Sequence, residues 1–349
     1  MASILFDNYL IISVTWLAGL TGVVSNFYII IKCIFKLKKL PITSGTKPIP
    51  DPKSSILVRR YIFYILMINM AIGDALGSFY LVILAIADIR YRLIQLPSTN
   101  SSSIRHGANF STAIELFTLW LHNPMCHLAR FIHYLSITHS ISMTGFIAID
   151  RFIRLKYAFK INIQITKKIL VIISIFPWMI SVPHALTGII LAKNTTIHST
   201  SVIIYEYHNL CSYDNLEIEF IKIYLLISML LGMLVYVMVF MMYLIIVYNI
   251  GEVKQHQLFI TTRFKDRKSE YVILTTAIMI TVTNFITWFP AFVVGMIIVF
   301  NPEFIGKNES FIIISSVFVV LFQSNCALNP LILIYNTKQR YNKVKLALG

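Results

Sequence analysis

Charged residues are scarce in this sequence, and their scarcity limits what kind of protein it can be. Only 13% of the 349 residues are charged, whereas 57% are hydrophobic and the mean hydropathy is strongly positive. Soluble globular domains carry about 25% charged residues. The composition therefore excludes an ordinary soluble domain and predicts a membrane protein.

Motifs of nucleotide-binding and metal-dependent enzymes are also missing. The sequence contains no Gly-x-x-x-x-Gly-Lys, no His-Glu-x-x-His and no Cys-x-x-Cys. It has no internal repeat either, and the segments between its apolar runs are short. We therefore predict one transmembrane domain over residues 1–349, with no catalytic residues and, apart from the sodium ion considered below, no cofactor.

Long apolar runs are what the sequence does have. A bilayer core of about 30 Å needs roughly 20 apolar residues in a helical crossing. The runs of this size are approximately 10–35, 61–87, 122–149, 168–191, 217–249, 271–300 and 311–335. They predict an all-α membrane protein, a seven-transmembrane helix bundle, followed by a short amphipathic eighth helix over about 337–347.

Basic residues are concentrated in alternate connections. The formal net charge is +15, and most of the 30 lysines and arginines lie in the first, third and fifth connections and in the tail. Lys and Arg gather on the cytoplasmic side of membrane proteins. We therefore predict an extracellular N-terminus and a cytoplasmic C-terminus at the plasma membrane. Nucleic acid is not an expected partner, because this charge flanks the membrane instead of forming one patch.

Asn-x-Ser/Thr sequons support this orientation, because all four fall in the even-numbered connections. They are Asn100, Asn109, Asn194 and Asn308, and we predict that they are glycosylated. The first apolar run is too long for a signal peptide and has no small-residue cleavage site after it. We interpret that run as a retained signal anchor.

Four cysteines need not form two disulfides in a membrane protein. Cys126 lies at the outer start of the third run and Cys211 lies in the second outer connection, so both face the oxidising side. A bridge between them would close a loop of about 85 residues and contribute roughly 4–5 kcal/mol in the chain-entropy model. We predict that bridge, and we expect Cys33 and Cys326 to be reduced.

An adjacent Asp150 and Arg151 close the third apolar run, in the stretch SMTGFIAIDRFIRLKYAF. Arg151 follows Cys126 by about 25 residues, or about 37 Å of helix, which is one full membrane crossing. One interpretation is that the pair only marks the water boundary. The other is a functional pair at the cytoplasmic mouth of the bundle, and the spacing favours it.

With these residues in place, the sequence resembles the rhodopsin-like family of G-protein-coupled receptors over nearly its whole length. Asp150-Arg151-Phe152 resembles the family's Asp-Arg-Tyr, and Thr287-Trp288-Phe289-Pro290 resembles its Cys-Trp-x-Pro. The remaining matches, each in its own helix, are Asn26, Asp74, Trp178 and Asn329-Pro330. The resemblance implies a receptor that transmits an extracellular ligand signal to a heterotrimeric G protein by an opening of the sixth helix.

The resemblance also implies a set of coupling and switch residues. Phe159 takes the place of the apolar residue that the family inserts into the G protein, and Tyr243 is placed to reach toward Arg151. Glu270 lies about 20 residues, or roughly 30 Å, before Pro290, which brings it to the depth of Arg151. We predict that Glu270 pairs with Arg151 at rest. The full set is Asp150, Arg151, Phe152, Phe159, Tyr243, Glu270, Trp288, Pro290, Asn329 and Pro330.

Asp74 is a carboxylate near the middle of an apolar run, where an ionisable residue is costly and usually functional. One interpretation is a structural polar plug satisfied by Asn26. On the resemblance, Asp74, Ser140, Asn325 and Asn329 form the family's sodium pocket, and oxygen ligands of this kind suit a hard cation such as Na⁺. Bound Na⁺ would favour the resting packing.

The ligand end is predicted to contain Arg130, His133 and Trp288. Arg130 and His133 lie on the helix face of Cys126, and His133 stands where amine receptors carry an aspartate, so an amine ligand is disfavoured. The run 311–335 has no lysine, which excludes retinal bound as a Schiff base. A peptide or an anionic small molecule fits this end, although Arg130 could instead snorkel to the lipid headgroups.

A fainter similarity, to one subfamily, is carried by NMAIGDALGSFYLVILAIADIRYR and VTNFITWFPAF. Both stretches resemble the transmembrane part of leucine-rich-repeat-containing receptors for relaxin-like and glycoprotein hormones. Those receptors carry a large ectodomain, whereas fewer than ten residues precede the first run here. We therefore interpret the similarity as one of ancestry and not of the ligand.

Several residues depart from the family pattern. Leu333 stands where the family has a tyrosine, and Tyr335 points about 200° away from that position on a helix. The fifth run has no proline, with Gly232 as its nearest helix breaker, and the tail has no cysteine and almost no Ser or Thr. Arrestin binding driven by tail phosphorylation is therefore not expected.

Two other functions stay open at this point. A seven-helix transporter or channel would use Asp74 and Arg151 to line a substrate path, but it would more often show inverted repeats and broken helix pairs. A non-signalling decoy receptor would bind ligand without coupling, and the Leu333 departure keeps that reading open.

Overall fold

The computed structural model describes the helices and parts of their connections. Backbone is described for Leu5 and for residues 8–40, 52–95, 120, 123–156, 167–195, 210–211, 219–256, 264–301 and 309–348. Side chains are described for Leu5, Trp120, Leu210, Cys211 and residues 8–40, 61–93, 123–153, 172–191, 219–248, 275–301 and 313–336.

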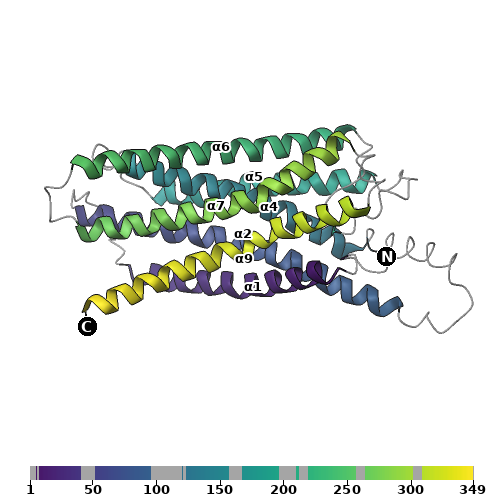
Figure 1. The fold of residues 1–349 in the computed structure, drawn as a ribbon, viewed down its shortest axis with the longest axis horizontal. Helices are drawn as coiled ribbons and strands as arrows, with labels where there is room; N and C mark the ends of the chain where they lie inside the picture. The colour runs from purple at the N-terminus through teal and green to yellow at the C-terminus, as the bar shows by residue number, and fades with distance from the viewer. Residues whose placement is uncertain are drawn as a thin grey trace, which may run out of the picture.

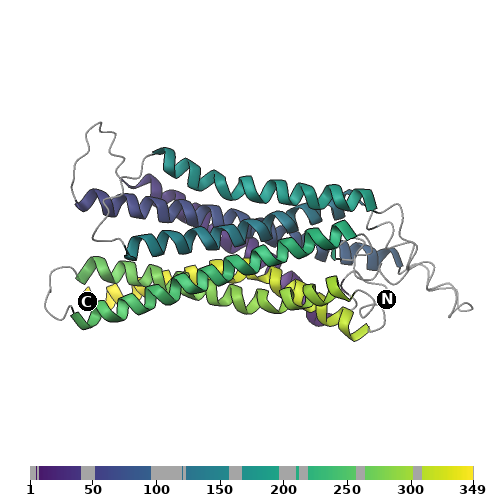
Figure 2. The ribbon, with the colours of Figure 1, turned by 90° about the horizontal axis from the view of Figure 1, so that it is seen from above.

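Seven long helices make up the described part of the chain, and no strand occurs in it. They are α1 (Tyr9–Lys38), α2 (Pro52–Gln95), α4 (Pro124–Lys156), α5 (Lys167–Thr195), α6 (Glu219–His256), α7 (Phe264–Phe300) and α9 (Glu309–Leu348). They run side by side along the long axis of the molecule (Figures 1 and 2). The all-helical, seven-helix bundle predicted from the apolar runs is confirmed.

Six of the helices in the described residues are long and apolar enough to cross a membrane. The exception is α4, which is long enough at 33 residues but carries many polar side chains. These side chains are buried because α4 contacts α2, α5, α6 and α7, so helices surround it. The helix packed on most sides can be polar, whereas the lipid-facing helices cannot.

Local sequence explains the ends of α1. The Asn8 side chain caps its start by accepting hydrogen bonds from the backbone N–H groups of Leu10 (3.0 Å) and Ile11 (3.3 Å). Lys36 and Lys38 lie in its last turn, where positive charge interacts favourably with the helix dipole.

The tail does not form a separate element in the structure. The backbone of α9 continues without a break from the seventh apolar run to Leu348, with Pro330 inside the helix. A distinct eighth helix over 337–347 is therefore not shown. The helix α2 is also longer than the apolar run from which it was predicted, because hydropathy marks the part inside lipid and not the polar turns beyond it.

Candidate functional site: a polar network along the bundle axis

Asp74 of α2 lies at the centre of a buried polar network. The residue is 2% exposed. Asn329 of α9 donates a hydrogen bond from Nδ2 to Asp74 Oδ2 at 3.0 Å, and the Ser140 hydroxyl of α4 lies 3.5 Å from Oδ1. Three helices thus meet at one carboxylate, and each contributes a residue that the sequence assigned to the sodium pocket.

Asn325 lines the same cavity as Asp74, but its amide group bonds to a different residue. It donates to Oδ1 of Asn284 on α7 at 2.6 Å, and Asn284 in turn donates to the Thr144 hydroxyl on α4 at 3.2 Å. Asn284 is fully buried. The network therefore extends from α2 and α9 to α7, the helix predicted to move.

A cavity of about 10 Å³, roughly the space of one water molecule, lies beside Asp74. Ser140, Asn325 and Trp288 also line it. The side-chain oxygens of Asn325 and Asn329 are buried and receive no hydrogen bond within the described structure. A carboxylate with two such oxygens fits a hard cation, which needs oxygen ligands.

Asn26 does not satisfy Asp74, so that part of the plug interpretation is wrong. Its amide nitrogen donates instead to the carbonyls of Gly22 and Cys326, both at 2.9 Å, and thereby joins α1 to α9. Asp74 contacts this region only through its backbone, whose carbonyl accepts a hydrogen bond from Ser78 at 2.9 Å. The rotation of α1 about its own axis explains this difference, because it turns the Asn26 amide nitrogen toward the backbone of α9 and not toward the Asp74 side chain on α2.

Trp288 of α7 lies directly against this network. It is 3% exposed, and its ring centroid lies 4.8 Å from that of Phe322 and 5.2 Å from that of Tyr236. Phe292 completes the cluster and approaches α6 at Gly232, where an added methyl group would lie 3.2 Å from the Phe292 ring. Pro290 lies inside α7 between Trp288 and Phe292.

Arg151 is buried at the opposite end of α4 from Cys126, with 6% of its surface exposed. Its Nη2 lies 3.3 Å from Asp150 Oδ2, and its guanidinium lies 5.3 Å from the centre of the Phe63 ring on α2. A cavity beside Arg151 is also lined by Thr276 and Ala277 of α7. The end of the bundle around Arg151 is therefore packed by α2, α4 and α7.

Tyr243 and Phe152 belong to the hydrophobic cluster around this end, Tyr243 as a buried member and Phe152 packed against it. The departure at Leu333 also has a structural counterpart, since Leu333 packs against the same cluster, whereas Tyr335 is 57% exposed. Tyr335 therefore does not substitute for an inward-facing tyrosine.

Several predicted residues lie outside the described residues. Phe159, Asn100, Asn109 and Asn308 fall in segments that are not described, and the side chains of Glu270 and Asn194 are not described either. Their roles remain predictions.

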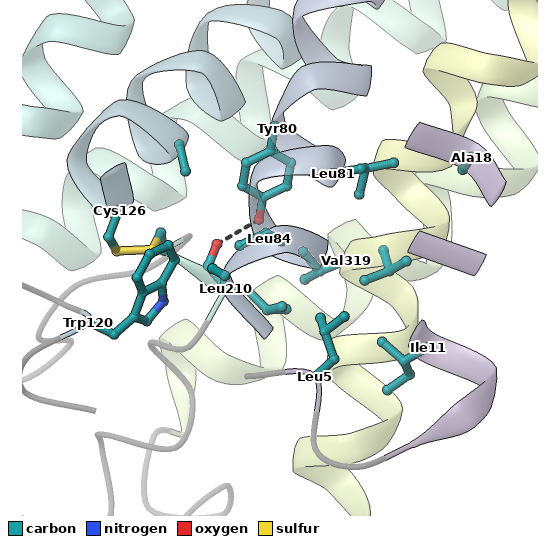
Figure 3. Close-up of a cluster of buried hydrophobic side chains, with 14 of the residues drawn as sticks. Leu5, Ile11, Ala18, Tyr80, Leu81, Leu84, Trp120, Cys126, Leu210 and Val319 are labelled. Atoms are coloured by element: carbon teal, nitrogen blue, oxygen red, sulfur yellow. Dashed lines mark hydrogen bonds between the residues drawn. A yellow bond between two sulfur atoms is a disulfide. The ribbon is translucent and has the colours of Figure 1, made fainter. Parts of the chain in front are cut away.

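The disulfide predicted between Cys126 and Cys211 is present, with the two Cα atoms 5.6 Å apart. It holds Leu210, whose carbonyl accepts a hydrogen bond from the Tyr80 hydroxyl at 2.6 Å (Figure 3). Leu5 is fully buried in the same cluster, close to Ile11 in Figure 3. We call this region the disulfide end of the bundle. Cys33 and Cys326 are free and buried, as expected.

Arg130 and His133 lie inside the bundle near this end. Arg130 is 1% exposed, so the alternative in which it snorkels to lipid headgroups is wrong. His133 is 3% exposed, and its ring centroid lies 4.5 Å from that of Tyr80. The face that holds both residues is turned toward α2 and the bundle interior, which hydropathy alone does not reveal.

Sequence reasoning missed several buried polar residues, some of them outside the network around Asp74. Asp88 accepts a hydrogen bond from the Leu5 backbone at 3.0 Å and pairs with Arg92 at 2.9 Å. The spacing of four residues between Asp88 and Arg92 was the available signal for that pair. Asn284 carried no such signal, because a single asparagine in an apolar run does not indicate its partner.

Two more contacts between helices were missed. The Trp178 indole donates to Asn69 Oδ1 at 3.0 Å and joins α5 to α2. Asn336 donates to the Thr276 hydroxyl at 3.2 Å and joins α9 to α7 near Arg151. Both connect positions far apart in the sequence, so only the fold brings them together.

Comparison with known protein families agrees with this arrangement. Residues 58–333 match the family described as 7 transmembrane receptor (rhodopsin family), which is most of the chain. A comparison with curated proteins finds no match. The chain therefore belongs to the rhodopsin family of seven-transmembrane receptors, which are multi-pass membrane proteins, typically of the plasma membrane, and not enzymes.

Proposed function

We propose that this receptor transmits an extracellular ligand signal to a heterotrimeric G protein by moving α7 away from α4. The observation that carries the proposal is the buried Arg151, covered by Phe63 and by the Thr276 end of α7. A displacement of α7 at this end would uncover Arg151 and open a cleft. A cleft with an apolar wall and the Arg151 cation suits a partner segment that inserts between the helices.

The coupling residues in this proposal surround that cleft. Asp150 holds the Arg151 side chain at rest through the 3.3 Å contact. Tyr243 and Phe152 supply apolar wall, and Glu270 provides a further anionic partner for Arg151. Phe159 would then contact the G protein.

Trp288, Pro290 and the Asn329-Pro330 pair would convert ligand binding into this motion. Trp288 contacts both the aromatic cluster and the cavity beside Asp74, so a shift of its ring changes both. Pro290 removes one backbone hydrogen bond from α7 and allows it to bend there. Pro330 does the same for α9 one residue after Asn329.

We further propose that the resting receptor holds Na⁺ at Asp74, with Ser140, Asn325 and Asn329 as its other neighbours. A bound cation would neutralise the buried carboxylate. It would also attract oxygen atoms from several helices and so hold these helices together. The two unpaired amide oxygens support this assignment. The chain's own contribution is to keep these oxygens close together and away from bulk water.

The proposed orientation places the disulfide end outside the cell and the Arg151 end in the cytoplasm. The four sequons and the basic connections support it. In this arrangement residues 1–349 form one transmembrane domain, and the basic stretch 337–347, which continues α9, lies on the cytoplasmic side.

The ligand is proposed to contact Arg130, His133 and Trp288. A buried guanidinium favours an anionic group, so a peptide with a carboxylate or an anionic small molecule fits better than an amine. The similarity of 69–92 and 282–292 to hormone receptors with leucine-rich repeats is proposed as one of ancestry.

A nucleotide-exchange assay on membranes carrying the full chain, with a panel of Gα subunits, tests the proposal, since basal coupling needs no known ligand. We expect exchange with at least one Gα subunit and its loss in Arg151→Ala. Lys222→Ala, a cation on α6 at the other end of the bundle, is the control and should couple as the wild type does. Absence of exchange with every Gα would favour the decoy reading, and substrate flux in proteoliposomes would favour a transporter.

A further inference from the structure

Leu5 lies outside the seven helices, yet its exposed fraction is 0%. It belongs to a hydrophobic cluster at the disulfide end that also contains Ile11 of α1, Leu84 of α2 and Val319 of α9 (Figure 3). A residue that precedes α1 therefore contributes its side chain to a core built from three helices.

The backbone of Leu5 is hydrogen-bonded at this depth. Its N–H donates to Asp88 Oδ1 at 3.0 Å, and its carbonyl accepts a hydrogen bond from the Asn8 N–H at 3.2 Å. Burying a peptide group without partners is costly, and these two bonds avoid that cost. Because the Asn8 side chain also caps α1, the second bond ties Leu5 to the start of that helix.

Asp88 is oriented for this contact by its own helix. Its other oxygen, Oδ2, accepts a hydrogen bond from Arg92 Nε at 2.9 Å, one turn further along α2. A carboxylate is also a stronger acceptor for an N–H group than a neutral oxygen. The site of Leu5 thus combines an oriented anion, which binds the backbone N–H, with an apolar cluster, which binds the side chain.

The helices around Leu5 also carry the centre of the polar network. The helix α2 bears Asp74 and α9 bears Asn329, and these two residues are hydrogen-bonded at 3.0 Å. Tyr80 of α2 belongs to the Leu5 cluster, and its ring centroid lies 4.5 Å from that of His133, a proposed ligand contact. The cluster therefore adjoins the proposed ligand residues and packs two of the helices that meet at Asp74.

We propose that Leu5 is an intramolecular ligand of this receptor and restrains it in the resting packing. Arg151 is covered in this structure, so Leu5 is bound in the packing that the proposed function, on which this restraint rests, calls resting. A contact that is made in one packing and weakened in the other shifts the equilibrium toward the first. An extracellular peptide that displaces Leu5, with an apolar side chain and a backbone N–H of its own, would therefore act as an agonist.

Thiol labelling on intact cells tests the binding of Leu5. Leu5→Cys places a thiol in the cluster, and the four native cysteines are either bridged or buried. A membrane-impermeant maleimide should label Leu5→Cys at least about ten-fold more slowly than Tyr9→Cys, because Tyr9 is 83% exposed. Equal labelling rates would overturn the proposal.

Variants of Asp88 test the polar half of the site. A hydrogen bond to a charged group contributes enough to change an equilibrium about ten-fold or more. Adding Asp88→Ala to Leu5→Cys should therefore raise its labelling rate about ten-fold, whereas Asp88→Asn keeps an acceptor oxygen and should raise it less. If Asp88→Ala leaves the labelling rate unchanged, Asp88 does not hold Leu5 and the site is wrong.

Basal nucleotide exchange tests the restraint. Leu5→Asp puts a second carboxylate beside Asp88 in an apolar cluster, which should release the segment and raise exchange several-fold at matched surface expression. Tyr9→Asp adds the same charge at an exposed position and should leave exchange unchanged. Leu5→Ala should act in the same direction as Leu5→Asp, and it carries the test if Leu5→Asp does not reach the surface. Unchanged or lower exchange in these Leu5 variants, with a wild type that couples, would refute the restraint.

The two assays separate this inference from the proposed function. A chain that protects Leu5→Cys from labelling but activates no Gα would contradict the proposed function and, with it, the restraint. A chain that couples but labels Leu5→Cys as fast as Tyr9→Cys would contradict only the role of Leu5.

Discussion

Replacing Asp74 with asparagine should remove any effect of sodium on the stability of the receptor while leaving the fold intact. In the structure Asn329 Nδ2 donates to Asp74 Oδ2 at 3.0 Å, and the Ser140 hydroxyl lies 3.5 Å from Oδ1. An asparagine can keep both contacts if its carbonyl faces Asn329 and its NH₂ faces the Ser140 oxygen. The substitution therefore removes the charge but leaves neither Asn329 nor Ser140 without a hydrogen-bond partner. It should lower the free energy of unfolding by no more than about 1 kcal/mol.

Sodium should stabilise the wild type by an amount that follows from linkage. At about ten times its dissociation constant, a ligand that binds only the folded state adds about 1.4 kcal/mol. For a chain of this length that corresponds to a rise in Tm of about 2 °C. Thermal unfolding of the purified chain in sodium and in a bulky organic cation, at equal ionic strength, measures the difference.

Asp74→Ala is the contrasting variant, because it leaves the Asn329 amide and the Ser140 hydroxyl without their acceptor. It should lose about 1–3 kcal/mol in either salt, whereas Asp74→Asn should unfold at one temperature in both salts. If the wild type shows no difference between the two cations, or if Asp74→Asn keeps the difference, the sodium assignment is wrong and Asp74 is a structural residue.

Three further predictions concern the two ends of the bundle. Cys126→Ser and Cys211→Ser should each lower surface expression and abolish sensitivity to reducing agents, since the bridge contributes roughly 4–5 kcal/mol; surface staining with and without reductant checks this. Tyr80→Phe leaves a buried carbonyl unpaired and should cost about 1–3 kcal/mol in thermal unfolding, with an unchanged melting curve as the contrary result. Glu270→Ala should raise basal nucleotide exchange several-fold, because a charge pair of about 1 kcal/mol shifts a poised equilibrium by that factor. Unchanged exchange at matched expression would contradict a pairing with Arg151.

Hydropathy predicted the number of helices correctly because bilayer thickness imposes a minimum apolar length on each crossing. It could not predict which way a side chain faces within the bundle. Arg130 illustrates the limit, since a cation one turn inside a helix end can reach lipid headgroups or the interior, and the structure buries it. Asn26 illustrates the same limit at the centre, where its partner is a backbone carbonyl of α9 and not Asp74.

Position along the helix, by contrast, was enough to predict the disulfide. Cys126 and Cys211 were assigned to the same side of the membrane, and the structure joins them. Side-chain hydrogen bonds between different helices at the same membrane depth were missed, such as the one between Asn284 and Asn325. The depth of a residue in the membrane can be predicted by counting residues along its helix. The side chains that it contacts at that depth depend on how the helices pack against one another.

The helix α4 connects the disulfide end of the bundle, the buried polar network and the Arg151 end. It is anchored by the disulfide at one end, carries Arg151 at the other, and supplies Ser140 and Thr144 to the network between them. Buried polar side chains recur along its length: Arg130, His133, Ser136, His139, Ser140, Thr144 and Arg151. Moving α4 would break several of these contacts at once, whereas α7 contributes mainly Asn284, Trp288 and Thr276 and has one face exposed to lipid. These contacts favour the proposed motion of α7 against a fixed α4, which would uncover Arg151.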